Sequence, residues 1–277
     1  MLTNNQREAA GERPCNGWPV MINKDLLDLA MDFHRRGNLV DAEAIYLALI
    51  QSAPDQADPP HLLGVIRAQQ GRYGDALALI GSALKLKPDA PEMLSNYGNL
   101  LRAEGRLGEA LTAYDRALAL MPHYAAVWNR RALLLRDFSR LDEALDSADR
   151  SLSFRPNSAE ALNTRGFILA DMGRFEDALA SYDKALAAAP DFPDTLNNRA
   201  LVLKALGRLE EALASVDRAL CLHDGFAEAW NSRGIILFEM KRPGEAMSAY
   251  DRALDIRPDY PEARDNRALT QASLQPN

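Results

Sequence analysis

The feature that most constrains this chain is a 34-residue period, which runs from Asn23 to Tyr260 without one insertion. In each period, two stretches have apolar residues every three or four positions, and a break that usually contains glycine separates them. This pattern predicts two amphipathic helices joined by a tight turn. One hairpin of this size cannot bury its own apolar face, so we expect successive hairpins to stack into one continuous body.

The period divides the chain into a tail, seven hairpins and a cap. We predict a disordered N-terminal tail over residues 1–22, because this segment is polar and contains glycine and proline, with Met21 as a second candidate start of translation. The last segment opens like an eighth hairpin but stops after one helix, and we expect it to cap a complete chain. The predicted hairpins span 23–56, 57–90, 91–124, 125–158, 159–192, 193–226 and 227–260, and the capping helix spans 261–277.

Two positions of the repeat carry only small residues. A larger side chain there would hold the two helices apart, so we expect the two positions to face each other within each hairpin. The twentieth position is Ala42, Ala76, Ala110, Ala144, Ala178, Ala212 and Ala246. The eighth position is Ala30, Gly64, Gly98, Ala132, Gly166, Ala200 and Gly234.

The ends of the helices are also marked. Glycine occupies the turn of five hairpins, and Ser139 and Lys241 replace it in the fourth and seventh. An acidic residue stands three positions into each second helix, where the helix dipole favours negative charge. With Ser139, Ala148 and Ser151 at turn and packing positions, we expect the fourth hairpin to be the weakest part of the array.

The repeat resembles the tetratricopeptide repeat family, whose signature reads W-x2-L-G-x2-Y, A-x3-F and then P over 34 residues. The fifth hairpin places Leu162, Gly166, Leu169, Ala178, Tyr182 and Pro190 at the signature positions and departs from the family at Arg165, where leucine is usual. Trp128 and Trp230 supply the family's aromatic opening in the fourth and seventh hairpins. The resemblance implies an all-α, right-handed α-solenoid superhelix whose first helices line a concave groove for a peptide or partner protein. Residues 91–124 look like the repeats of bacterial O-linked glycosyltransferase-like proteins.

Composition and motifs argue against several function classes. Acidic residues outnumber basic ones, 39 to 32, so we expect no nucleic-acid partner. No apolar run reaches the length of a membrane span, so we expect no membrane insertion. The two cysteines, Cys15 and Cys221, and the four histidines lack metal-ligand spacing, and no catalytic motif occurs. We therefore predict a cytoplasmic protein that is not an enzyme and that holds no metal or other cofactor.

A row of asparagines on the first helices is the candidate binding site. Amides at one repeat spacing can hydrogen-bond the backbone of an extended peptide, although the same residues can instead bond neighbouring helices or water. By the family resemblance this row faces the groove. The predicted groove residues are Asn96, Asn129, Asn163, Asn197 and Asn231, the apolar residues Leu133, Phe167, Leu201 and Ile235, and the cations Arg102, Arg136 and Lys204.

A second pattern links neighbouring hairpins. An aspartate on each second helix lies 16 residues before an arginine on the next first helix. We expect partly buried ion pairs between hairpins with a structural role, since the planar guanidinium suits a carboxylate in a packed seam. The pairs are Asp115–Arg131, Asp149–Arg165, Asp183–Arg199, Asp217–Arg233 and Asp251–Arg267; two earlier seams have Leu47–Leu63 and Gly81–Tyr97 instead.

The favoured function is a non-enzymatic scaffold that binds an extended peptide or partner protein in the groove of the third to seventh hairpins. One alternative is that the chain recruits substrates for a separately encoded glycosyltransferase. Another is self-association through the solenoid ends, where the first hairpin is rich in apolar residues such as Leu26, Leu27 and Met31.

Overall fold

The protein is an all-α helical-repeat solenoid. The computed structural model describes residues 23–274, so the tail predicted over residues 1–22 and the last three residues lie outside the described part. The described residues form fifteen helices and no strand. The first helices of the hairpins are α2 (Asn23–Arg35), α4 (Asp58–Gln69), α6 (Pro91–Ala103), α8 (Ala125–Asp137), α10 (Ala159–Asp171), α12 (Pro193–Ala205) and α14 (Ala227–Glu239). The second helices are α3 (Leu39–Ser52), α5 (Tyr73–Leu86), α7 (Leu107–Leu120), α9 (Leu141–Phe154), α11 (Phe175–Ala188), α13 (Leu209–Leu222) and α15 (Pro243–Ile256), and α16 (Pro261–Ser273) follows them.

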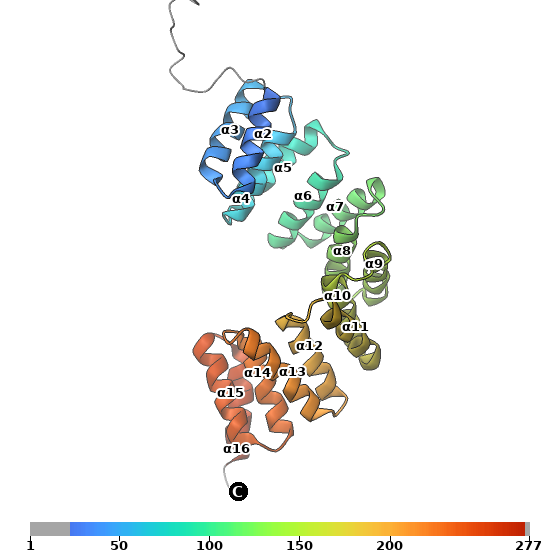
Figure 1. The fold of residues 1–277 in the computed structure, drawn as a ribbon, viewed down its shortest axis with the longest axis vertical. Helices are drawn as coiled ribbons and strands as arrows, with labels where there is room; N and C mark the ends of the chain where they lie inside the picture. Colours follow the sequence, from blue (N-terminus) through green and yellow to red (C-terminus); the bar gives the residue numbers. More distant parts are fainter. Residues whose placement is uncertain (1–22, 275–277) are drawn as a thin grey trace, which may run out of the picture. The chain divides into compact units, whose positions relative to one another are not determined.

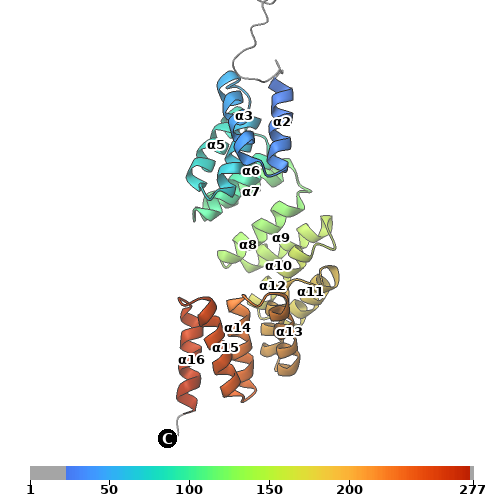
Figure 2. The same cartoon turned by 60° about the vertical axis from the view of Figure 1, so that its left-hand side comes forward.

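The helices are grouped into two compact units. Unit 1 ends at Leu120 and contains α2 to α7, and unit 2 begins at Met121 and contains α8 to α16. In both units, each first helix packs against the second helix that follows it, and each second helix packs against the next first helix of the same unit (Figures 1 and 2). Within residues 23–274, no helix has both the length and the apolar character needed to cross a lipid bilayer.

The first helices of unit 2 form its inner side. Each of α8, α10, α12 and α14 contacts the next first helix in addition to its own hairpin partner. No two second helices of the unit are in comparable contact among the described residues. Because the spacing between neighbours is tighter on the first-helix side, that side is the concave one within this unit.

The turns between paired helices require a left-handed backbone. Five glycines adopt positive φ there, from 72° at Gly173 to 78° at Gly37. Ser139 and Lys241 take the same conformation at φ 58° and 59°, although a side chain disfavours it. The fourth and seventh hairpins therefore keep the same turn geometry at an added conformational cost.

The second helices begin with ion pairs as well as favourable dipoles. An arginine at the N-cap reaches the acidic residue three positions later, as in Arg106–Glu109, where Nε–Oε1 and Nη2–Oε2 are both 2.7 Å. The hydrogen bond from Arg106 lowers the pKa of Glu109 below its ordinary value. The same pair recurs as Arg72–Asp75, Arg140–Glu143, Arg174–Asp177, Arg208–Glu211 and Arg242–Glu245.

The expected contact between the two small positions is only partly correct. The alanines at the twentieth position are fully buried, as predicted. The glycine at the eighth position, however, mainly contacts the residue on the second helix that lies four positions after the alanine of the twentieth position. For example, a β-carbon added at Gly98 would lie 2.6 Å from Cε1 of Tyr114, four residues after Ala110. At Gly64 the carbonyl oxygen of Ala76, at the twentieth position, is also close, 3.2 Å from such a β-carbon. Where the eighth position is glycine, a buried tyrosine or isoleucine lies across it.

Candidate functional site

Asparagine side chains link successive first helices. Asn163 Oδ1 accepts a hydrogen bond from Asn198 Nδ2 at 3.3 Å, and Asn231 Oδ1 accepts one from Asn266 Nδ2 at 3.0 Å. In unit 1, Asn96 Nδ2 lies 3.0 Å from Nε2 of His61, which takes the place of asparagine in the second hairpin. In each case the fifth position of one first helix bonds the sixth position of the next. These amides therefore help to hold the concave face together.

Two asparagines of the same row have an unused acceptor. Oδ1 of Asn129 and Oδ1 of Asn197 are buried and have no hydrogen-bond partner within residues 23–274. Asn197 is 7% exposed, and Asn129 borders a small polar cavity of about 80 Å³ that Arg130, Ser158 and Glu160 also line. A buried carbonyl without a donor is unfavourable by about 1–3 kcal/mol, so both oxygens can gain from a donor that reaches them.

An apolar row runs beside the amides. Leu133, Phe167, Leu201 and Ile235 occupy one repeat position of α8, α10, α12 and α14, and Leu269 of α16 continues the row. Leu201 is 36% exposed and Leu269 is 67% exposed, whereas the other three are half-buried. The first helices of unit 2 thus carry half-buried or exposed apolar side chains at repeat spacing.

The predicted cations of unit 2 are not free. The Arg136 guanidinium lies 3.4 Å from the centre of the Phe167 ring, and its Nε is 2.5 Å from Asp171 Oδ2. Lys204 Nζ lies 3.1 Å from Glu239 Oε1. Each pair joins one first helix to the next, so positive charge on this face is balanced locally. Arg102, the third predicted cation, is an exposed residue of unit 1.

The predicted aspartate–arginine pairs form hydrogen-bonded ion pairs in unit 2. Nε of Arg165, Arg199 and Arg233 lies 2.7 Å from Oδ1 of Asp149, Asp183 and Asp217, and Arg267 lies 2.5 Å from Asp251. Arg165 Nη1 also donates to Ser181 Oγ at 2.7 Å. Arg131 makes the equivalent bond to Ser147 Oγ, while its predicted partner Asp115 belongs to unit 1. Since the four arginines are 21–38% exposed, these pairs are partly buried, as expected.

The 34-residue period does not reveal the acidic acceptors on neighbouring first helices. Asp171 and Glu239 each follow a predicted groove cation by 35 residues, one more than the period. The same spacing of 35 relates Asn163 to Asn198 and Asn231 to Asn266. A search at 35 residues would have found both sets, because that spacing brings side chains of neighbouring first helices together. Among the described residues, no group of His, Cys, Asp or Glu has a geometry that could hold a metal ion.

Comparisons with known proteins agree on the repeat. One family model described as tetratricopeptide repeat matches residues 61–125, 98–159 and 164–225, and a second with the same description matches residues 227–260. Together these matches cover more than half of the chain. A search of curated proteins found no significant match.

Several solved structures share the fold. A tetratricopeptide repeat protein from Parabacteroides merdae superposes with a TM-score of 0.72 at 21% identity, covering 90% of this chain and 98% of that one. The Cut9–Hcn1 heterotetramer of the APC/C gives 0.76 at 16% identity, covering 87% of this chain and 48% of that one. YrrB, described as a TPR protein with an unusual peptide-binding site, gives 0.52 at 22% identity, with 68% and 97% covered. At these identities the similarity establishes the fold.

Proposed function

The chain belongs to the tetratricopeptide repeat family, and from this premise we propose that it is a non-enzymatic scaffold that binds an extended segment of a partner protein. The segment binds along the first helices of unit 2. The observation that carries this proposal is the apolar row on α8, α10, α12, α14 and α16, which includes the exposed Leu201 and Leu269. The described peptide-binding site of YrrB, a protein of similar fold, supports peptide binding as a use of this architecture.

The repeat spacing limits which segments fit. Packed helices lie about 8–10 Å apart, and an extended chain advances about 3.3 Å per residue. A bound segment therefore places roughly every third residue opposite the next first helix. We expect partner segments with an apolar residue at every third position, since each would meet one residue of the row.

The amides would supply hydrogen bonds to the backbone of the segment. Asn129 and Asn197 have carbonyl oxygens that no donor among residues 23–274 reaches, and a peptide N–H would supply that donor. Asn163 and Asn231 accept hydrogen bonds from the next first helices, and these bonds would fix the positions of the helices that line the groove. We therefore assign backbone recognition to Asn129 and Asn197, and a supporting role to the other two.

A peptide-display selection against the full chain tests this proposal. We expect selected peptides to bind with dissociation constants of about 1–100 μM, and Leu201→Asp to weaken them at least about tenfold, because the charge would lie in the apolar row. The matched control is Leu222→Asp, which changes a leucine of similar exposure on α13, the second helix of the same hairpin. Equal binding to the wild type and to Leu201→Asp would refute the groove as the site.

Self-association is a second candidate because apolar residues are exposed in the first hairpin and on α16. Val40 is 79% exposed. Leu269 on α16 is 67% exposed, and Leu274, which follows this helix, is 52% exposed. If solenoid ends stack on each other, the mass measured by light scattering rises with concentration, and Leu274→Asp with Val40→Asp abolishes the rise. A constant mass equal to the monomer's excludes this candidate. The glycosyltransferase partnership and the cytoplasmic location stay predictions of the sequence analysis.

A further inference from the structure

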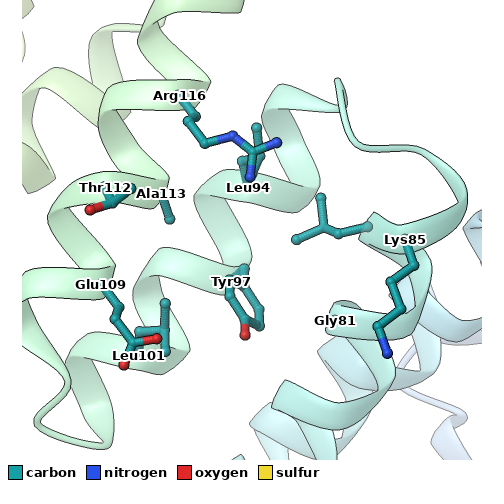
Figure 3. Close-up of a pocket in the computed structure, with 10 residues that line it drawn as sticks. Gly81, Lys85, Leu94, Tyr97, Leu101, Glu109, Thr112, Ala113 and Arg116 are labelled. Atoms are coloured by element: carbon teal, nitrogen blue, oxygen red, sulfur yellow. The ribbon is translucent and has the colours of Figure 1, made fainter.

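Unit 1 has a recess lined by two second helices and the first helix between them. It lies between α5, α6 and α7 and has a volume of about 380 Å³. Leu84, Leu94 and Leu101 give it apolar walls. Figure 3 shows Tyr97 extending from α6 into the space between Gly81 on α5 and Glu109 on α7. We call it the α5–α7 recess.

The repeat itself creates this recess. A second recess, of about 500 Å³, lies three hairpins later between α11, α12 and α13 of unit 2. Each residue that lines it has its repeat equivalent in the wall of the α5–α7 recess. The equivalent pairs are Gly81 and Asp183, Leu84 and Leu186, Lys85 and Ala187, Leu94 and Leu196, Tyr97 and Arg199, Glu109 and Glu211, Thr112 and Ala214, Ala113 and Ser215, and Arg116 and Arg218.

The two recesses differ at the two repeat positions that form an ion pair in unit 2. In unit 2 the ion pair between Asp183 and Arg199 lines the wall, with Nε and Oδ1 2.7 Å apart. In unit 1 Gly81 and Tyr97 stand in these two places, so an aromatic ring and a bare backbone replace two charges. A β-carbon on Gly81 would lie 3.7 Å from Tyr97 Cε2, in ordinary contact, so the missing side chain leaves open space beside the ring. The substitution removes one ion pair from the wall and adds an aromatic ring to it.

In the seventh hairpin a tryptophan occupies the repeat position of Leu94, which shows that an indole ring fits there. Trp230 stands where Leu94 stands in unit 1 and packs against a cluster that includes Leu237 and Ala249. These two residues are the repeat equivalents of Leu101 and Ala113, which line the α5–α7 recess. The Trp230 indole N–H donates to the carbonyl oxygen of Asp224 at 2.8 Å. The smaller Leu94 leaves the corresponding space in unit 1 for a ring from another molecule.

The charges around the recess favour an anion. Lys85 and Arg116 line it from α5 and α7; in Figure 3 the Arg116 guanidinium lies beside Leu94, whereas the Lys85 side chain extends past Gly81 at the other edge of the recess. Arg116 Nη2 donates to the Pro88 carbonyl oxygen at 3.1 Å, which leaves its guanidinium charge without a carboxylate, and Lys85 has no ion pair among residues 23–274. The one acid of the wall, Glu109, is held by Arg106. A ligand with a negative charge next to its ring therefore complements this site.

From these observations we propose that the α5–α7 recess binds an aromatic side chain, of indole or phenyl type, from a partner segment that carries a neighbouring carboxylate. The ring packs against Tyr97 and the leucines, and the carboxylate faces Lys85 and Arg116. The proposal concerns a separate surface in unit 1 and does not depend on the groove of unit 2.

Titration of the isotope-labelled full chain with N-acetyl-tryptophan, followed by NMR, tests this site. We expect saturable shifts in α5, α6 and α7 with a dissociation constant of about 1 mM, a usual value for a ligand of this size. The neutral N-acetyl-tryptophanamide and the Lys85→Glu variant should each weaken binding about two- to fivefold, as loss of an exposed charge pair does. Binding of the amide as tight as that of the acid would contradict the assigned role of the cations.

The decisive variant is Gly81→Asp with Tyr97→Arg, which installs the ion pair that the chain already uses in four seams of unit 2. This variant should unfold at or above the wild-type temperature and lose the shifts in α5 to α7. Gly81→Met is a second variant, because it fills the recess without a charge and should also remove binding. If either folded variant binds N-acetyl-tryptophan like the wild type, or if no shifts appear in these helices by about 10 mM, the proposal is wrong.

Discussion

Gly166 on α10 lies directly against the ring of Tyr182 on α11: a β-carbon on the glycine would lie 2.6 Å from Cε1 and 2.8 Å from Cδ1 of that ring. Tyr182 is 1% exposed, and burial raises the pKa of its hydroxyl well above the ordinary value. Gly98 and Tyr114 have the same relationship in unit 1. In the sixth hairpin the same two positions hold Ala200 and Val216, so a small residue pairs with different partners in different hairpins.

This relationship predicts that Gly166→Ala destabilises the protein. Overpacking costs about 1–3 kcal/mol, and the better helix propensity of alanine returns up to about 1 kcal/mol, so we expect a net loss of about 1–2 kcal/mol. The substitution should cost almost nothing in a Tyr182→Val background, which reproduces the Ala200 and Val216 combination. Urea unfolding of the double-mutant cycle measures the coupling. A neutral Gly166→Ala would show that the ring can move aside for alanine, the combination found at Ala30 and Tyr46.

The ion pair of Asp183 and Arg199 should contribute modestly to stability. Its side chains are 53% and 21% exposed, so solvent screening limits the coupling to about 0.5–1 kcal/mol. We expect a D183A/R199A cycle to show this value at low salt and less than half of it in 1 M NaCl. The same cycle on Arg208 and Glu211, a more exposed pair at the start of α13, provides the comparison and should give a smaller coupling. Equal coupling in both cycles would argue against a special role for the seam.

Ser139→Gly should stabilise the protein. Ser139 adopts φ 58° in a turn where five other hairpins have glycine, and a left-handed conformation costs a residue with a side chain about 1–2 kcal/mol. The greater entropy of glycine in the unfolded chain offsets part of this, which leaves a gain of about 0.5–1 kcal/mol. Gly173→Ala is the reverse control and should lower the unfolding temperature. A Ser139→Gly variant that melts below the wild type would contradict this account of the turn.

The fourth hairpin should open more readily than the fifth. Second helix α9 buries Ser147, Ala148 and Ser151, whereas α11 buries Tyr182 and Leu179 in addition to its small residues. Less buried apolar surface means a lower free energy of local opening. We expect amide hydrogens of α9 to exchange at least about tenfold faster than those of α11 under native conditions. Equal protection of the two helices would show that this hairpin is not a weak point.

His61 should make unit 1 less stable in mild acid. Burial lowers the pKa of its imidazole, and protonation of Nε2 would also remove the acceptor for Asn96 Nδ2. Asp58 and Glu92 oppose this shift, and Lys87 reinforces it. The unfolded chain takes up the proton near pH 6.5 while the folded chain resists it, so stability is full above pH 6.5 and falls below it.

Chemical unfolding at several pH values measures the His61 effect. The matched variant is His61→Asn, because asparagine occupies this repeat position in four other hairpins and can keep a hydrogen bond to Asn96. Between pH 6.5 and 5 the wild type should lose more stability than the variant. Parallel pH profiles for the two proteins would rule out His61 as the cause.

Much of the fold was predictable from the residues alone. Residues at fixed places in the period, such as Gly173 in a turn and Ala178 against its partner helix, depend on contacts within one hairpin or between neighbours. The 16-residue spacing of Asp183 and Arg199 likewise predicted a contact that is present at 2.7 Å. Local sterics and helix geometry act over one repeat length, so the pattern reports them directly.

The sequence by itself determined the number of hairpins, the pairing of their helices and the ion pairs along the seams, because each of these repeats with the period. Only the tertiary structure decided which side chains remain available. It engaged Asn163 with Asn198 and left Oδ1 of Asn197 without a donor, although both asparagines occupy the same repeat position. It also showed that Gly81 and Tyr97, which look like a missing ion pair, line a recess. Whether a side chain at a given repeat position remains free to bind depends on the residues that the neighbouring helices place next to it. The repeat pattern does not specify these residues.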